Sequence, residues 1–341
     1  MIEKTIHIGP VFDGGMGSVI QGYIKLFGLP KENAWNSYRN GFLKSLPCLF
    51  AICFKVLFIR QKEIVCYHLH SASRGSMLRK LIIALCLKLR DKKIIVHLHG
   101  GGTQKFYTQG ISTKILLWTL IKISNAVICI TEQMKNFIKK ERLKCRIFLI
   151  PNLCETIMEK SVDLAHHQEP VKIVYCGTFV KNKGFFDLIE AFEKAKFEYP
   201  VILDLFGNGI VPEIEKRNIN IRGWVEHSEY LKLLPDYDFF VLPSYVEVFP
   251  MSILEAMGVG LPIIGTYAGG MPEMIENGKT GILFKAGDIN ELTAALEKLA
   301  NDKNLRVEFG KNAWIRANNK YAPQLIQKLL EEIYSCQKLQ G

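Results

Sequence analysis

Two glutamates, Glu247 and Glu255, lie eight positions apart in a segment that reads Glu-Val-Phe-Pro-Met-Ser-Ile-Leu-Glu. The run 237–244 before them is typical of a strand, and the run 252–257 is typical of a helix. Pro250 fits a first helical position, because its missing N–H costs nothing there. The free N–H groups and positive dipole end of that helix would bind an anion such as a phosphate. Two carboxylates around an anion-binding helix start suit a sugar joined to a nucleoside diphosphate.

A glycine-rich segment, Asp13-Gly-Gly-Met-Gly-Ser18, follows the first expected strand and precedes the helix that we expect to start at Ser18. Glycines such as Gly15 and Gly17 would let the backbone approach a phosphate or a sugar closely. The segment is not GxGxxG, and no acidic residue follows at a clear strand end near position 33, which disfavours a dinucleotide site. A tight structural turn remains an alternative.

Two histidines, His97 and His99, end another expected strand and precede three glycines. Being two positions apart, they face the same side of the strand. A metal site is disfavoured because no Asp, Glu or Cys follows at useful spacing, so we expect no metal. His99 lies next to the glycines and is the better candidate to bond a sugar hydroxyl or a phosphate. His68 and His70 repeat the pattern, and a structural role for them remains open.

Two lysines, Lys181 and Lys183, lie in a glycine turn after the strand 171–176. Lys183 could neutralise a diphosphate that leaves with growing negative charge, although an ordinary solvated turn would have the same composition. The glycines of the segment 267–273 predict a second anion-binding turn. The Asp236-Tyr-Asp238 sequence leads directly into a strand, so we interpret it as a turn and not as a metal site.

Segments typical of strands alternate with segments typical of helices along the whole chain. The strand segments are 6–11, 64–70, 93–99, 126–130 and 146–151, and then 171–176, 201–206, 220–223, 239–242 and 261–265. This alternation is typical of parallel strands joined by crossover helices. The polar run 166–170 interrupts it, so we place a linker between about residues 155 and 170. The sequence predicts two doubly wound α/β domains that face each other across a cleft.

Charge is distributed unevenly over the 341 residues. Residues 1–165 hold 25 Lys and Arg against 10 Asp and Glu, net +15, whereas residues 166–341 hold 19 against 23, net −4. No aromatic-basic motif of a nucleic-acid module occurs, so we expect no nucleic-acid partner. Two cationic, apolar helix candidates, 42–60 and 73–93, would instead suit an anionic membrane surface, although a core-facing helix with solvated lysines remains possible.

The compartment that we expect is the cytoplasm. The start of the sequence carries an early acid and lacks the long apolar core of a signal peptide, and no run of about 18 uncharged apolar residues occurs. Nine scattered cysteines without a CxxC pair are typical of buried thiols in a reducing environment. Together with the cationic helices, these features predict a peripheral protein on the inner face of the cell membrane.

The ordered set of motifs resembles the family 4 retaining glycosyltransferases of the GT-B fold, in particular those that build bacterial surface polysaccharides. The resemblance runs through nearly the whole chain. It rests on Gly14–Gly17, His97–Gly100, Ile150–Asn152, Gly177 with Lys183-Gly184, Gly207–Gly209, Gly223–Val225, Pro243-Ser244, Glu247, Glu255–Gly258, Gly269–Glu273 and Gly278–Gly281. It implies an acceptor-binding domain over 1–160 and a donor-binding domain over 165–321. It also implies a final helix, at about 322–341, that packs back on the first domain.

The resemblance also implies a role for each matching residue. Glu247 would hold hydroxyls of the transferred sugar, and His99 would contact that sugar near its anomeric carbon. Lys183, with the Gly15–Gly17 loop, would grip the diphosphate, and Glu255 would hold the ribose. The remaining implied donor contacts are Thr178, Gly223, Phe249, Pro250, Met251 and Ser252. Trp224, beside Gly223, would help to frame the base.

The function implied is transfer of a hexose or N-acetylhexosamine to a lipid-linked or polysaccharide acceptor. The donor expected first is a UDP or GDP sugar. The configuration at the anomeric carbon would be retained, and no metal or other cofactor would take part. One departure is Thr178, where the family usually has an arginine, so a fixed guanidinium on the diphosphate is missing. Two alternatives remain: a GT-B epimerase of sugar nucleotides, and a non-catalytic scaffold in a membrane assembly.

Overall fold

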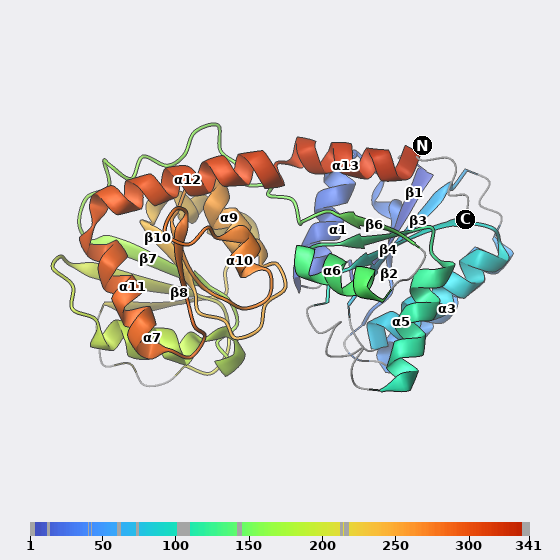
Figure 1. Cartoon of the computed structure of the whole chain (residues 1–341), viewed down its shortest axis with the longest axis horizontal. Helices are drawn as coiled ribbons and strands as arrows, with labels where there is room; N and C mark the ends of the chain where they lie inside the picture. The colour runs from blue at the N-terminus through green and yellow to red at the C-terminus, as the bar shows by residue number, and fades with distance from the viewer. Residues whose placement is uncertain are drawn as a thin grey trace. The chain divides into compact units, whose positions relative to one another are not determined.

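The chain forms two compact units. The computed structural model describes residues 4–11, 14–39, 41, 43–59, 63–72, 75–100, 110–141, 145–211, 214 and 218–335. Unit 1 comprises residues 1–153 and 323–341, and unit 2 comprises residues 154–322. Figure 1 labels the elements of both units. Each unit is a parallel sheet covered by helices, so the predicted α/β architecture with two doubly wound units is confirmed.

Unit 1 is built on a six-stranded sheet in the order β2-β1-β3-β4-β5-β6, and all its strand pairs are parallel. Its strands are β1 (Thr5–Gly9), β2 (Ala34–Asn36), β3 (Cys66–Ser71), β4 (Lys93–Leu98), β5 (Ala126–Cys129) and β6 (Arg146–Leu149). Its helices are α1 (Gly14–Leu26), α2 (Leu46–Phe58), α3 (Gly75–Leu89), α5 (Ile111–Ile123), α6 (Glu132–Lys140) and α13 (Pro323–Ser335). The central strand β5 is wholly apolar, and β4 is apolar apart from Lys93 and His97, because helices bury both faces of the sheet.

Unit 2 repeats this design with the order β12-β11-β10-β7-β8-β9, again all parallel. Its strands are β7 (Val171–Cys176), β8 (Val201–Phe206), β9 (Ile219–Gly223), β10 (Phe239–Leu242), β11 (Ile263–Thr266) and β12 (Gly281–Phe284). Its helices are α7 (Phe185–Lys194), α8 (His227–Leu233), α9 (Met251–Val259), α10 (Met271–Met274), α11 (Ile289–Asn301) and α12 (Lys303–Tyr321). Counted outward from β7, this is the strand order of the Rossmann fold.

Several strand bounds differ by one or two residues from those expected from the sequence, and two helix starts and two edge strands differ more. Helix α1 begins at Gly14 and not at Ser18, so Gly15 and Gly17 belong to its first turn and not to a loop before it. Helix α9 begins at Met251, and Pro250 precedes it as the N-cap residue. The edge strands β2 and β12 were not predicted, because each is short and is stabilised mainly by its one neighbouring strand.

The final helix, α13, belongs to unit 1 and packs through buried side chains such as Ile326, Leu330 and Ile333. Two side chains of the sheet, Lys93 and His68, hold it by three hydrogen bonds. The Lys93 ammonium donates to the carbonyls of Ile333 and Tyr334 at 3.0 Å each, and the Tyr334 hydroxyl lies 2.6 Å from Nδ1 of His68. The C-terminal end of the chain therefore completes the unit that its beginning forms.

Candidate functional site

The strand order of unit 2 reverses between β7 and β10. The chain leaves β7 and β10, which are neighbours in the sheet, toward opposite faces of the sheet. The loops after β7 and β10 therefore separate at this point. In open α/β sheets such a point is where ligands bind, at the carboxyl ends of the strands. Lys183 follows β7 and Glu247 follows β10, so both predicted residues lie at the switch point.

The two loops at the switch point are bonded to each other. The carbonyl of Asn182 accepts a bond from the backbone N–H of Tyr245 and another from the hydroxyl of Ser244, both at 3.0 Å. Next to it, Gly184 has a φ of +67°, and a Cβ there would collide with the carbonyl of Pro243. A glycine is therefore required for the loops to approach this closely.

Lys183 and Glu247 form an ion pair across this junction. The lysine Nζ lies 2.5 Å from Oε1 of the glutamate, and the two side chains are 33% and 9% exposed. A charge-assisted hydrogen bond of this kind holds both groups in one geometry. The structure thus brings together the ammonium expected on a diphosphate and the carboxylate expected on a sugar, which are 64 positions apart in the chain.

The backbone of Glu247 is supported by the turn between β11 and α10. Gly270 donates its N–H to the carbonyl of Val248 at 2.8 Å. Gly269 has a φ of +57°, and a Cβ there would collide with the carbonyl of Glu247. The glycines of this turn, which the sequence suggested as an anion site, therefore lie against the loop that carries Glu247.

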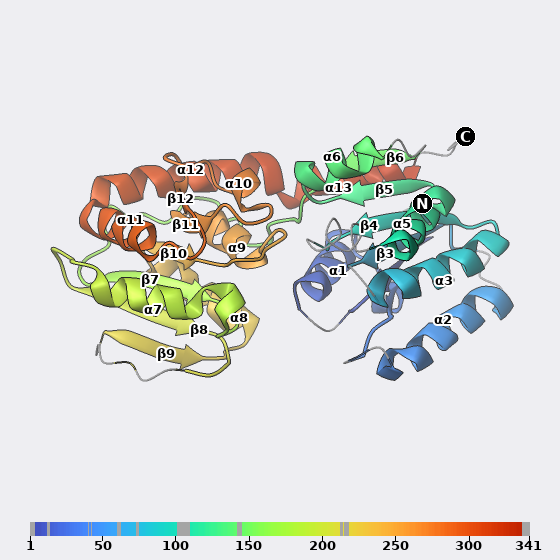
Figure 2. The ribbon, with the colours of Figure 1, turned by 60° about the horizontal axis from the view of Figure 1, so that its bottom comes forward.

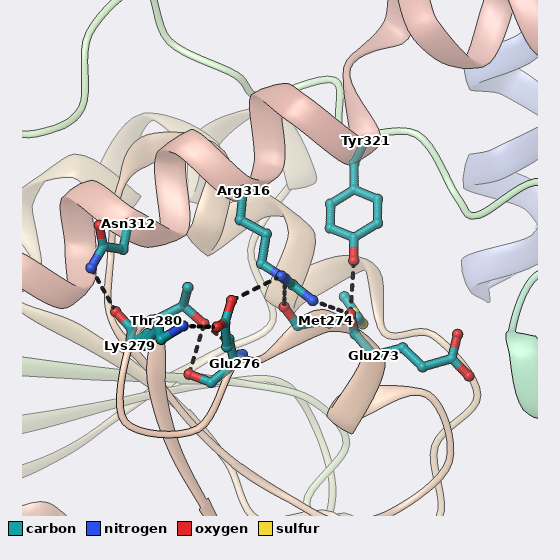
Figure 3. A network of polar contacts seen from close by, with 8 residues as sticks. All are labelled: Glu273, Met274, Glu276, Lys279, Thr280, Asn312, Arg316 and Tyr321. Carbon is teal, nitrogen blue, oxygen red and sulfur yellow. Dashed lines mark hydrogen bonds and ion pairs between the residues drawn. The ribbon is translucent and has the colours of Figure 1, made fainter.

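Helix α12 anchors the end of that turn (Figure 3). Arg316 donates to the carbonyls of Glu273 and Met274 at 2.8 and 2.7 Å and lies 3.3 Å from the carboxylate of Glu276. The Tyr321 hydroxyl also donates to the carbonyl of Glu273, at 3.2 Å. Neither Arg316 nor Tyr321 stood out in the sequence, because nothing local marks a residue that bonds carbonyls some 40 positions away.

Replacing Arg316 with alanine is expected to lower the free energy of unfolding of unit 2 by about 2–3 kcal/mol, since two carbonyls lose a charged donor. Urea denaturation measures this. The matched control is Lys311→Ala, an exposed position on the same helix, where a change below about 0.5 kcal/mol is expected. Equal stability of the two variants would show that the network in Figure 3 does not hold the turn.

The start of α9 offers backbone N–H groups beside Glu247. Pro250 caps this helix without a side-chain hydrogen bond, so the first N–H groups, including those of Met251 and Ser252, lack an intrahelical acceptor. Both residues are half-buried, whereas Pro250 and Phe249 are buried. The Phe249 ring packs edge-on against Tyr321 at 5.6 Å. Phe249 and Pro250 therefore shape the helix start, and Met251 and Ser252 supply its donors.

Glu255 lies on α9 and is paired with a histidine that the sequence did not point to. Oε1 of Glu255 lies 2.9 Å from Nε2 of His227, the first residue of α8. Glu255 is 9% exposed in this pair, whereas His227 is 61% exposed. The hydrogen bond to the carboxylate raises the pKa of His227 above its ordinary value of 6.5.

The contribution of His227 to stability is expected to fall as the pH rises. Because the pKa is raised in the folded state, the bond is at full strength below the unfolded pKa of 6.5 and is lost as the pH passes the folded pKa. The Tm difference between the wild type and His227→Gln should be larger at about pH 5.5 than at about pH 8.5. In a Glu255→Gln background the difference should no longer be larger at the lower pH to the same extent, and an undiminished excess would refute this pairing.

The other predicted donor contacts of unit 2 lie on its surface. Thr178 is exposed, and its carbonyl accepts a bond from the Tyr175 hydroxyl at 2.9 Å. Gly223 ends β9 with a φ of +72°, and no atom lies within 4 Å of where its Cβ would be. Trp224, next in the chain, is 65% exposed. These positions leave room for a ligand.

Three predicted residues lie in unit 1. His99 directly follows β4, its N–H donates to the carbonyl of Ser71 at 2.8 Å, and only 9% of the residue is exposed. Gly15 and Gly17 lie in the first turn of α1, where Gly15 is exposed with open space around its Cα and Gly17 is buried. The remaining residues of these motifs, Asp13, Gly101 and Gly102, lie outside the described residues.

Comparisons with known proteins point to one family. Residues 156–315 match the family model "Glycosyl transferases group 1". The capsular polysaccharide biosynthesis glycosyltransferase CapM of Staphylococcus aureus is 30% identical over 172 residues, which cover 48% of this chain and 45% of that protein. An uncharacterized 41.2 kDa protein in the cps region of Klebsiella pneumoniae is 23% identical, over 86% of this chain and 89% of its own. The chain thus spans about half the length of CapM.

The solved structures agree in fold. Anabaena HepE in complex with UDP superimposes with a TM-score of 0.75 at 16% identity, covering 97% of this chain and 99% of that one. Sucrose-phosphate synthase from Thermosynechococcus elongatus gives 0.74 at 17% identity, with 97% and 98% covered. The chain has the two-domain α/β fold of these GT-B proteins, and the match to the glycosyl transferases group 1 model lies in its second unit.

Proposed function

We propose that this protein is a retaining glycosyltransferase of cell-surface glycan biosynthesis. It would transfer a hexose or N-acetylhexosamine from a nucleotide diphosphate sugar to a lipid-linked or polysaccharide acceptor. The observation that carries the proposal is the Lys183–Glu247 pair at the switch point of unit 2, beside the open start of α9. CapM is named for capsule biosynthesis, and HepE was solved with UDP-glucose, which supports this class of reaction and a UDP or GDP donor.

The residues of unit 2 suit the parts of such a donor. Lys183 and the N–H groups of Met251 and Ser252 supply positive charge for the diphosphate. Glu247, released from Lys183 when the diphosphate takes its place, can accept hydroxyls of the transferred sugar. Glu255 can do the same for the ribose in place of His227. The free protein thus pairs each carboxylate with a cation or a histidine that the donor would displace.

The chemical step is a substitution at the anomeric carbon. The bond from that carbon to the diphosphate oxygen breaks, and a bond to the acceptor oxygen forms on the same face. The acceptor proton passes to the leaving diphosphate, so no protein nucleophile and no metal enter the scheme. Lys183 stabilises the negative charge that grows on the diphosphate, and His99 would contact the sugar.

A membrane surface is the second part of the proposal. Helices α2, α3 and α5 pack side by side on unit 1 (Figure 2), and none of the three contains an Asp or Glu. Their exposed apolar side chains form what we name the apolar face: Phe50, Phe54, Phe58, Leu78, Ile82, Leu85, Leu89, Ile111, Ile115 and Trp118. Exposed Lys44, Lys88, Arg90 and Lys122 lie on or beside these helices.

Such a face suits the inner leaflet of a cell membrane, since apolar side chains enter the acyl boundary while lysines meet anionic headgroups. Among the described residues, no helix is both long enough and apolar enough to span a bilayer. We therefore place the protein at the cytoplasmic side, attached peripherally, where a lipid-linked acceptor would be within reach of unit 1.

The proposal is tested by offering UDP-, GDP-, ADP- and dTDP-sugars in a thermal-shift panel, because a bound donor must raise the Tm. The donor that does so is then incubated with a lipid-linked acceptor, and the product is examined by NMR for its anomeric configuration. Retention supports the proposal. Conversion of the donor without any acceptor would indicate an epimerase, and absence of donor binding in calorimetry would indicate a non-catalytic scaffold.

A further inference from the structure

Five histidines of unit 1 form one buried cluster on a single face of its sheet. They are His7 of β1, His68 and His70 of β3, His97 of β4, and His99 directly after β4. The strand registers pair His7 with His68 and His70 with His97, and paired residues of parallel strands share a face. None of the five is more than 9% exposed. Residues from three strands thus share one polar interior.

Burial keeps these imidazoles neutral. It lowers the pKa of His7 and of His99 to about 3, and it lowers the pKa of the other three well below 6.5. A neutral imidazole carries one N–H and one bare nitrogen, so each contact between two rings needs a donor on one side and an acceptor on the other. The protons of the cluster are therefore ordered along its hydrogen bonds.

Three of the histidines form a chain that ends at His99. Nδ1 of His7 lies 3.0 Å from Nε2 of His70, and Nδ1 of His70 lies 3.0 Å from Nε2 of His99. Because each ring has only one proton, the donors must all run in the same direction. They run either from His7 outward to His99 or from His99 inward to His7.

The inner end of the chain decides between the two directions. Nε2 of His7 is buried and has no hydrogen-bond partner among the described residues. The inward direction would leave a buried N–H without an acceptor at this nitrogen, whereas the outward direction leaves a nitrogen lone pair without a donor. Buried N–H groups without an acceptor are rarer in proteins than buried acceptors without a donor. The outward direction puts the proton of His99 on Nδ1, at the member of the chain that is nearest to the surface.

From this geometry we infer that His7 and His70 are positioning residues that hold His99 in its Nδ1–H tautomer. His99 then accepts from His70 through Nε2 and offers its Nδ1–H to a ligand, always as a donor. This role rests on the proposed function, in which His99 contacts the transferred sugar. A hydroxyl or phosphate oxygen of the donor substrate would be the acceptor for this N–H.

A metal ion is the competing explanation of the cluster. Two overlapping groups, His7 with His68 and His70, and His70 with His97 and His99, have ring nitrogens within 4.8 Å of one another. A metal, however, lies in the ring plane of each of its imidazole ligands. Each group contains two rings that lie over one another: the centroids of His68 and His70 are 4.3 Å apart, and those of His97 and His99 are 4.0 Å apart. Rings this close direct their lone pairs along separate planes, which disfavours a shared ion. The centroids of His70 and His99 are 5.2 Å apart, as an edge-to-edge hydrogen bond between ring nitrogens requires.

The tautomer of His99 can be observed directly in long-range proton–nitrogen correlation spectra of the full chain labelled with ¹⁵N-histidine. Each of the eight histidines is assigned by its own substitution. We expect His99 to carry its proton on Nδ1 in the wild type. In His70→Phe an aromatic ring remains at this position but both hydrogen bonds are lost, so His99 should shift to mainly Nε2–H, the tautomer that a free histidine side chain prefers. kcat/KM should fall about tenfold.

The control is His97→Phe, which removes an equally buried histidine that bonds His68 and lies outside the chain. It should leave the tautomer of His99 unchanged. Two variants of His7 provide a second test should His70→Phe not fold. In His7→Asn the amide can still donate to His70, so His99 should keep its proton on Nδ1. In His7→Leu this donor is lost, so His99 should show a mixture of both tautomers. An Nε2–H tautomer in the wild type, or an unchanged tautomer in both His70→Phe and His7→Leu, would overturn the inference.

Two further outcomes separate the explanations. Stoichiometric Zn²⁺ in the purified protein, measured by atomic emission, together with metal-shifted nitrogens, would replace the chain by a metal site. The spectra require neither donor nor acceptor, so a wild type without transferase activity would refute the proposed function and leave the tautomer result intact. Full activity in a folded His70→Phe variant with the altered tautomer would refute the positioning role alone.

Discussion

Replacing Lys183 with alanine is expected to lower kcat/KM by about 10²–10³-fold. The reason is that a preorganised charge aimed at the leaving diphosphate stabilises the transition state more than the ground state. Release of the nucleoside diphosphate in the presence of donor and acceptor measures the effect. The missing arginine at Thr178 increases the expected loss, because Lys183 is then the main fixed charge after β7.

Lys181→Ala is the matched control, since this exposed lysine belongs to the same short helical turn, Lys181–Lys183. Its effect should be within about threefold. Because Glu247 is only 9% exposed, Lys183→Ala should also cost about 1–3 kcal/mol of stability by leaving the carboxylate without its partner. Adding Glu247→Gln should restore stability without restoring activity. Wild-type turnover in a stable Lys183→Ala variant would exclude the proposed mechanism.

A triple change of Phe50, Phe54 and Phe58 to serine is expected to weaken binding to anionic vesicles by about 100-fold. The three rings recur every fourth residue on α2 and are 69%, 59% and 72% exposed, so they can enter a bilayer without unfolding the helix. Fully burying one such side chain is worth about 1.5–3 kcal/mol, so half of that for three rings gives about 2.2–4.5 kcal/mol, a range that includes the roughly 2.7 kcal/mol of a 100-fold change.

Co-sedimentation with vesicles containing phosphatidylglycerol measures this binding, and added salt should weaken it because the lysines beside the apolar face contribute electrostatically. The control is Tyr199→Ser with Leu233→Ser and Ile315→Ser, three exposed apolar residues of unit 2. Binding of the control should match the wild type. Should both triple variants bind equally well, the apolar face would not be the membrane contact.

The sequence predicted the regular elements of the central sheets well. The strands at 171–176, 201–206 and 239–242 match β7, β8 and β10 in both bounds. Such strands are buried on both faces, so their apolar runs are continuous and end at clear turn residues. The edge strands β2 and β12 lack this signal because neighbouring strands define them. The start of α1 was placed four residues late, since its glycines are weak helix formers.

What the sequence determined by itself is which side chains stand at the carboxyl ends of the strands, because local patterns mark where a strand stops and a helix starts. On that basis it identified Lys183, Glu247 and His99 as candidates. Only the tertiary structure decided their partners. Lys183 meets Glu247, Glu255 meets His227, and His99 meets His70, each across 28 to 64 positions.

The physical reason is that such contacts depend on strand order and register, which the packing of the whole sheet decides. The histidines show it most clearly. In the sequence, the place of His99 beside glycines at a strand end favoured a sugar contact, and the absence of Asp, Glu or Cys at useful spacing disfavoured a metal. The pairing of β1, β3 and β4 then added His7 and His70, and with them the hydrogen bonds that order the protons around His99.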